Sequence, residues 1–385
     1  MDTAANPTRP TEMPTALHKQ GGWGRSAAQP PGPPLGAPAG RPQPPRGNAR
    51  RRGFTLTELL VVIAIIAVLA ALVTVAASRA ISKAGQTRIS LEISELSRTL
   101  EDFKGKYLAY PPNGMNDHGV SASNQSLDNI VSSDIERMFK KAFPRNKEPR
   151  DLILALAGVG PSGTNLENGM RAGEALYFWL GGFSDDPEYP ISGQGGPSFD
   201  VSTGEVLEDR NRQQGYEFDL TRLVPRTDAG IFDENKGRFI TYQDPRTGNP
   251  RRINFWQYVP SGFEQPFVYF DTSRHKPADY EMPAAPGVNN GPQIYALTKL
   301  REGLGGVSAI NTPFTDIIYA NNAKYQILHP GIDDAWGEYS RNVSLAQYLS
   351  DASQYLPYPS GPFTGEMADN LANFVSGTLA DAQEE

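Results

Sequence analysis

The chain has 385 residues, with 36 Lys and Arg, 43 Asp and Glu, four His and no Cys. The absence of cysteine excludes a disulfide framework, a thiol nucleophile and Cys-based metal sites, and four dispersed histidines leave little material for His-based metal or triad chemistry. A net charge of −7 speaks against nucleic-acid binding as the main function, because such binding normally needs a basic face.

The first 53 residues differ from all the others. Residues 1–53 contain eight Lys and Arg, two acids, 11 Pro and eight Gly, for a net charge of +6, so the remainder carries −13. A segment with so few apolar residues cannot bury enough surface to offset its chain entropy. We therefore expect 1–53 to be a disordered basic leader.

A long apolar run follows the leader. In the nineteen residues from Leu59 to Ala77 the only polar one is Thr74. As a helix they would measure roughly 28 Å, close to the thickness of a hydrocarbon core of about 30 Å. We expect 54–77 to be a transmembrane helix. Four basic residues lie just before it, and by the positive-inside rule they predict a cytoplasmic N-terminus and an exported remainder: Arg46, Arg50, Arg51 and Arg52.

Two ordinary explanations of this run compete with a more specific one. A cleaved secretory signal could end at Val75-Ala76-Ala77, but its apolar core would be too long. A plain signal anchor leaves Glu58 unexplained, because a carboxylate in a spanning helix costs on the order of 2–3 kcal/mol near the bilayer centre unless it is paired or reaches the headgroups.

The apolar run continues into an amphipathic segment. Apolar residues recur there at spacings of four and three: Ile89, Ile93, Leu96, Leu100, Phe103 and Tyr107. This pattern predicts one continuous helix from Phe54 to Tyr107, ended by Pro111-Pro112. A coiled coil is the competing interpretation. Since the stripe covers fewer than three heptads, we expect 78–108 to pack on the protein's own head.

The head, 109–385, is rich in Gly, Pro, Asn and Asp turns. Short β-like runs are predicted at 237–242, 266–271 and 325–328. Helical runs are predicted at 133–143, 151–157 and 173–180. An early helix and late strands favour an α+β fold, with an antiparallel sheet packed on 78–108 and large insertions between about 113 and 265. No catalytic or nucleotide-binding motif occurs, so we expect no enzymatic activity.

The string RRGFTLTELLVVIAII at 51–66 resembles the N-terminus of type IV prepilins and type II secretion pseudopilins. Basic residues, Gly53, Phe54, Glu58 and the apolar run carry the resemblance. It implies that a prepilin peptidase cleaves between Gly53 and Phe54 and methylates the new Phe54 amine. It also implies that Glu58 pairs with the Phe54 amine of a neighbouring subunit. The leader is longer than is typical of the family, and a start at Met13 would shorten it without moving the cut.

The resemblance further implies a pilin-like fold and a place in the bacterial inner membrane as a single-pass protein with a periplasmic head. The partners it implies are the peptidase, other pilin or pseudopilin subunits and the inner-membrane assembly platform, with no nucleic acid. Four further strings more loosely resemble segments of large pilin-like proteins with the same N-terminus: 174–182, 325–334, 369–374 and 377–379. For Tyr177, Phe178 and Trp179 we expect core packing.

One metal site is a candidate. By resemblance, major pseudopilins hold calcium near the end of the sheet, where this chain has Asp333, Asp334 and Glu338. Because calcium needs six to eight oxygen ligands, a solvated acidic turn is the alternative. We interpret Asp233 to Gly237 as a hairpin turn, because Arg238 stands where a calcium loop of the EF-hand type needs glycine.

Three functions remain open from the sequence. The first is a type II secretion pseudopilin, a structural filament subunit. The second is a type IV pilin, although no cysteine pair near the C-terminus favours an adhesive pilin. The third is a membrane-anchored exported binding protein that does not polymerise.

Overall fold

The computed structural model describes residues 53–114, 125–160, 166–200, 215–225, 237–275, 284–285, 294–301, 317–337, 358–359, 361 and 363–384. The leader up to residue 52, most of the turn at 233–237 and Glu338 lie outside these ranges. The chain divides into two units, Met1–Ala64 and Ile65–Glu385.

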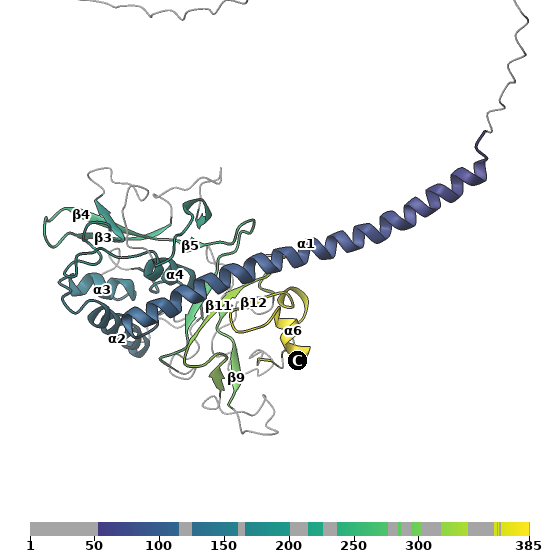
Figure 1. The fold of residues 1–385 in the computed structure, drawn as a ribbon. Coiled ribbons are helices and arrows are strands. Elements are labelled where there is room, and N and C mark those ends of the chain that lie inside the picture. Colours follow the sequence, from purple (N-terminus) through teal and green to yellow (C-terminus); the bar gives the residue numbers. More distant parts are fainter. Residues whose placement is uncertain are drawn as a thin grey trace, which may run out of the picture. The chain divides into compact units, whose positions relative to one another are not determined.

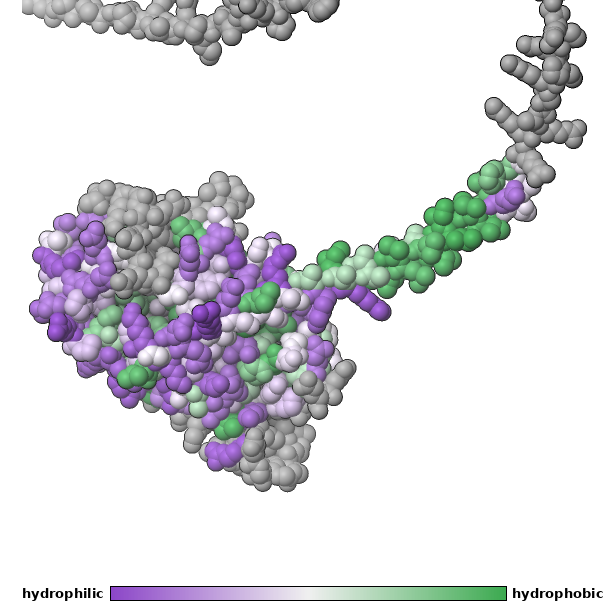
Figure 2. All heavy atoms as spheres, in the orientation of Figure 1, coloured by the Kyte–Doolittle hydropathy of each residue, from purple (hydrophilic) through white to green (hydrophobic). Residues whose placement is uncertain are grey.

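The longest element is helix α1, Leu56–Tyr107. Its predicted stripe is confirmed, because Ile89, Ile93, Leu96, Leu100 and Phe103 are all buried. The helix ends where Leu108 takes a left-handed conformation with φ +60°. Before the stripe, the large apolar side chains are exposed, and Figure 2 shows them as a continuous apolar surface along the helix.

Gly85 lies inside this helix for a packing reason. A Cβ at position 85 would lie 3.3 Å from Cγ2 of Ile332. Glycine costs about 1 kcal/mol relative to alanine inside a helix. Here that cost lets the turn that contains Ile332 approach the helix closely.

The described part of the head contains four α-helices. Three of them were predicted, α2 (Gln125–Ala142), α3 (Arg150–Leu156) and α4 (Ala172–Leu180), although α2 begins eight residues before the expected start at 133. The fourth is a short α6 (Leu379–Glu384). All nine residues of α4 are buried. Tyr177, Phe178 and Trp179 are therefore core residues, as expected, and the indole Nε1 of Trp179 donates to the carbonyl of Pro112 at 2.8 Å.

The strands form several small antiparallel sheets. Their bounds are β1 (Ser198–Asp200), β2 (Leu223–Val224), β3 (Arg238–Gln243), β4 (Pro250–Phe255), β5 (Gln257–Tyr258), β6 (Val268–Asp271), β7 (Ala284–Ala285), β8 (Ile294–Tyr295), β9 (Thr298–Leu300), β10 (Ile317–Tyr319), β11 (Tyr325–His329) and β12 (Leu371–Ala372). The orders are β1-β4-β3, β12-β11-β6, β10-β9, β2-β5 and β7-β8.

The antiparallel pairing and the α+β class are as expected, but the single sheet that we expected is divided. Strands of two to six residues, interrupted by Pro- and Gly-rich turns, are too short to continue one ladder. The predicted strands near 237–242, 266–271 and 325–328 are β3, β6 and β11. The β1-β4-β3 sheet and helices α2 to α4 come from the region 113–265, where we expected insertions.

The main core lies between α1, α4 and the β12-β11-β6 sheet and extends to α2 and α3. In Figure 1, α1 crosses in front of the region that contains α4, β11 and β12. Two polar contacts fix the helix on the sheets. The hydroxyl of Tyr325 donates to the carbonyl of Ser97 at 3.1 Å, and Arg222 forms an ion pair with Glu92. A second apolar cluster includes Val268 and Phe270 on β6, together with residues from β8 to the C-terminus.

Two leucines on α1 test this packing. Leu96 is fully buried, whereas Leu91 is 61% exposed. We expect Leu96→Ala to lower the free energy of unfolding by about 2–5 kcal/mol, and Leu91→Ala to change it by less than about 0.5 kcal/mol. Thermal unfolding of the detergent-solubilised chain measures both. Equal losses in the two variants would show that the stripe does not hold the helix to the head.

Candidate functional site

Helix α1 begins at a reciprocal cap between Thr55 and Glu58. The backbone N–H and the hydroxyl of Thr55 both donate to Oε2 of Glu58, at 2.8 and 2.9 Å. In return, Oγ1 of Thr55 accepts from the N–H of Glu58 at 3.2 Å. This is a capping box, which the Thr-x-x-Glu spacing in the sequence signals. Glu58 therefore caps the helix, a role that we did not expect beside headgroup contact or pairing between subunits.

The cap starts the helix two residues after Phe54, so Gly53 and Phe54 lie before it. Phe54 is 83% exposed, and a Cβ placed on Gly53 would meet no atom within 4 Å. The peptide bond between Gly53 and Phe54 is therefore outside the helical hydrogen-bond ladder. A protease needs such a peptide, because it must bind its substrate in an extended form.

The helix after the cap is suited to lipid. Among the described residues, α1 is the one helix long and apolar enough to cross a membrane, and its most apolar window is not buried by the protein. Between Leu59 and Ala77 the one polar side chain is that of Thr74, and its hydroxyl donates to the carbonyl of Ala70 at 2.8 Å. The hydroxyl proton is thus satisfied within the helix and needs no water.

Two of the looser sequence strings, 325–334 and 369–374, come together at β11. Strand β11 pairs with β12, and Oδ1 of Asn373 accepts from the N–H of Ile327 at 2.8 Å. The carboxylate of Asp369 accepts from the N–H of Ile332 at 2.7 Å. At Gly331, with φ +86°, a Cβ would lie 2.4 Å from the carbonyl oxygen of Asp369. These strings therefore build a tight turn and its support.

The string at 174–182 is also structural in this part of the chain. The carboxylate of Glu174 is buried and accepts from the N–H of Arg171 at 2.8 Å and from the guanidinium of Arg238 at 2.7 Å. Burial raises the pKa of Glu174, and the charge of Arg238 opposes that shift. The pair caps α4 and ties it to β3.

The candidate calcium residues act as turn acceptors where the structure describes them. The carboxylate of Asp334 accepts from the N–H groups of Glu264 and Gln265 at 2.8 and 3.3 Å, and Oδ1 of Asp333 accepts from Ala335 at 2.9 Å. Within the described ranges no three His, Asp or Glu side chains are grouped to hold a metal. Because Glu338 lies outside those ranges, calcium binding by Asp333, Asp334 and Glu338 stays a prediction.

His329 is fully buried beneath the same turn. Its Nε2 lies 3.1 Å from the carbonyl of Gln265, and its Nδ1 accepts from the N–H of Gly331 at 3.2 Å. Because Nδ1 accepts a hydrogen bond, it carries no hydrogen, so the ring is neutral with its hydrogen on Nε2. Burial lowers the pKa of His329 to about 3. The 3.9 Å approach of Asp334 is therefore not an ion pair.

The neutral ring predicts acid sensitivity. Between pH 6.5 and 3 the unfolded chain binds a proton on His329 and the native chain does not, so stability falls as the pH falls through this window. From pH 7 to pH 5 we expect this residue to cost about 2 kcal/mol of the free energy of unfolding. His329→Gln, which keeps one donor and one acceptor, should lose less stability over that range in denaturant titrations. An identical pH dependence in the two proteins would contradict the neutral ring.

Comparison with known proteins identifies the N-terminal segment. Residues 48–74 match the family model of the prokaryotic N-terminal methylation motif. No curated protein and no solved structure matches the chain. A motif of this kind indicates a membrane-anchored, structural pilin-like subunit, which is normally non-enzymatic, and it implies processing by a prepilin peptidase and assembly with other pilin subunits. With the long apolar helix that follows it, the motif fits a type IV prepilin or pseudopilin.

Proposed function

We propose that this protein is a subunit of a pilus-like filament, and specifically a type II secretion pseudopilin. The observation that carries the proposal is the methylation motif at 48–74, followed directly by an apolar helix whose side chains are exposed. Exposed apolar helix surface must be covered by lipid before assembly and by other subunits after it. In this proposal the N-terminus lies in the cytoplasm, and the head lies on the periplasmic side of the inner membrane.

Processing occurs between Gly53 and Phe54 in this proposal, and the new amine of Phe54 is methylated. Two features support this position. The peptide precedes the capped helix, and both residues are free of packing contacts that would hinder a peptidase. Glycine also leaves room for close approach to the backbone.

Glu58 then joins neighbouring subunits through the amine of Phe54. The capping box uses only Oε2, and among the described residues Oε1 has no hydrogen-bond partner. One carboxylate can therefore keep the helix capped and still accept from the ammonium group of another subunit. In lipid both charges are costly alone, so their pairing relieves two penalties and sets the axial register between helices.

A type IV pilin is the second candidate, since both systems share this N-terminus. The absence of a cysteine pair favours the secretion system over an adhesive pilin. Neighbouring genes for a secretion ATPase and a secretin would support the first candidate. A membrane-anchored binding protein that never polymerises is the third, and Glu58 separates it from the other two.

Mass spectrometry of the protein from its own membrane tests the processing. We expect a mature chain that begins at Phe54 and is heavier by one methyl group. Gly53→Val should retain the whole leader, because the β-branched side chain blocks approach to the peptide. An intact leader on the wild-type protein would favour the plain membrane anchor.

Two substitutions separate the cap from the pairing. Glu58→Gln keeps an acceptor for the cap but has no charge, so we expect normal membrane insertion and loss of filaments. Thr55→Val removes the hydroxyl but keeps the carboxylate, so we expect filaments to persist with a helix start weakened by about 1 kcal/mol. Membrane fractionation and electron microscopy of sheared filaments measure these outcomes. Normal filaments from Glu58→Gln would sink the charge-pairing argument.

A further inference from the structure

The end of the head at which α1 stops is basic. Lys141 of α2 donates to the carbonyl of Leu108 at 2.8 Å, so the last turns of α1 and α2 meet there, as Figure 1 shows. We call this end the tip, and its exposed cations are Lys104, Lys106, Lys140, Lys141 and Arg145. Two exposed acids on the preceding turn of α1, Glu101 and Asp102, leave the tip with an excess of three positive charges.

The head does not neutralise these cations. In the described part of the chain, none of the five lies within ion-pair distance of an acid. Lys104 and Lys106 lie over the rings of Tyr110 and Tyr107, at 4.4 and 5.0 Å from the ring centroids. Cations in the last turn of a helix favour its dipole. Arg145, however, follows the end of α2, so the helix dipoles alone do not account for the tip.

The end of the head at which α1 enters it is acidic. A Cβ at Gly85 would lie 3.3 Å from Ile332, and the turn that contains Ile332 brings acids together here. We call this end the base, and its acids are Glu264, Asp333, Asp334 and Asp369. The carboxylate of Asp334 accepts from the N–H of Glu264, and that of Asp369 accepts from the N–H of Ile332. Burial raises the pKa of Asp334 and of Asp369, and the negative charge of Asp333 adds to both shifts.

The charge of the base is only partly balanced. Arg88 of α1 reaches it, where Nη1 donates to the carbonyl of Ser261 at 3.3 Å, and an excess of three negative charges remains. Within the described ranges no Lys or Arg forms an ion pair with any of the four carboxylates.

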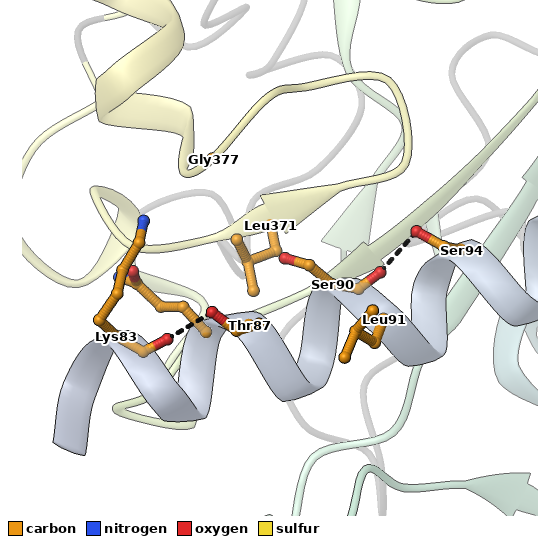
Figure 3. Close-up of a pocket in the computed structure, with 8 residues that line it drawn as sticks. Lys83, Thr87, Ser90, Leu91, Ser94, Leu371 and Gly377 are labelled. Atoms are coloured by element: carbon orange, nitrogen blue, oxygen red, sulfur yellow. Dashed lines mark hydrogen bonds between the residues drawn. The ribbon is translucent and has the colours of Figure 1, made fainter. Parts of the chain in front are cut away.

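A groove beside α1 shows what a balanced part of the head looks like. It has a volume of about 220 Å³, and in Figure 3 it lies between the helix and the segment that carries Leu371 and Gly377. Lys83 lines it, and the charge of Lys83 helps the hydrogen bonds from Thr378 to lower the pKa of Asp381. Here one cation and one carboxylate offset each other, which does not happen at the tip or at the base.

The tip and the base cannot neutralise each other within one subunit. Gly85 and Lys106 are 21 residues apart, or roughly 30 Å along the helix. Surface charges interact weakly beyond the Debye length, about 10 Å at 0.1 M salt. A second copy displaced along α1 by the height of the head brings the tip of one copy to the base of the other.

We propose that the tip of one subunit docks on the base of another copy of this chain, outside the membrane. This contact rests on the filament proposed above, because parallel α1 helices place the two ends opposite each other. Pairing of Glu58 with a Phe54 amine displaces adjacent helices by four residues, roughly 6 Å, so the docked ends belong to subunits about five steps apart. Since the contact joins two different surfaces, it does not close on itself and extends as a filament.

The absence of cysteine makes cross-linking the direct test. Lys140→Cys places one thiol at the tip, and Glu264→Cys places one at the base; both side chains are exposed. We expect a short bis-maleimide to join the two variants when they are produced together in their native membrane. A chain with both substitutions should give a ladder of multimers, because its own two thiols are too far apart for the linker. The matched control is Lys324→Cys, at an exposed lysine outside both ends, which should not be joined to Glu264→Cys.

Two further measurements test whether charge brings the ends together. In the Lys140→Cys chain, Arg145→Glu should lower the yield of tip-to-base product at least about threefold, because exposed charge pairs are lost. Arg145→Lys should leave the yield unchanged. Sodium chloride at about 1 M should lower the yield as well, because the Debye length falls to about 3 Å.

Electron microscopy of the same samples distinguishes the failure of this contact from the failure of the filament. Filaments without tip-to-base product would overturn the contact alone, whereas the absence of both would overturn the filament and the contact together. Equal yields with Lys324→Cys, or a yield that Arg145→Glu does not lower, would show that charge complementarity does not join the two ends. Thermal unfolding of each variant establishes that it is folded, and Arg145→Cys retains the test should Lys140→Cys fail to fold.

Discussion

The burial of one face of α1 is the contact on which the described head depends. Ile89, Ile93, Leu96 and Leu100 are each at most 3% exposed, and they meet α4 and the β12-β11-β6 sheet. The sheets themselves are small, with strands of two to six residues that could not be stable alone. A long helix with a continuous apolar stripe supplies the surface on which these short pieces become one core.

The same helix has a second, opposite property. Up to Ile81 its large apolar side chains are exposed. In water, an apolar surface of this length is unfavourable and favours association with lipid or with other proteins. Two of the polar side chains in this part are satisfied within the helix, Thr74 by the carbonyl of Ala70 and Glu58 by the Thr55 cap. The cap leaves one carboxylate oxygen for another subunit, so a single side chain serves local helix formation and the proposed assembly.

The strings at 174–182, 325–334 and 369–374 have a structural explanation. Glu174 caps α4 and pairs with Arg238, whereas Gly331 and Asp369 form the turn that approaches Gly85 of α1. His329 is held neutral beneath this turn. Such residues hold α1 and the sheet close together, although they lie far apart in the chain.

The sequence alone determined the parts of this protein in which neighbours along the chain interact. Helical periodicity predicted α1, its buried stripe and helices α2 to α4, because residues three and four apart share a face whatever they pack against. The Thr-x-x-Glu spacing is also a local signal, and the structure shows that it forms a capping box at the start of α1. Tertiary structure decided the rest: the division of one expected sheet into several, the meeting of Asp369 with the turn after β11, and the groove between α1 and Gly377. These features bring together residues that are distant in the chain, 37 positions apart for Ile332 and Asp369 and far more for Lys83 and Gly377, and no local pattern in the chain specifies such pairings.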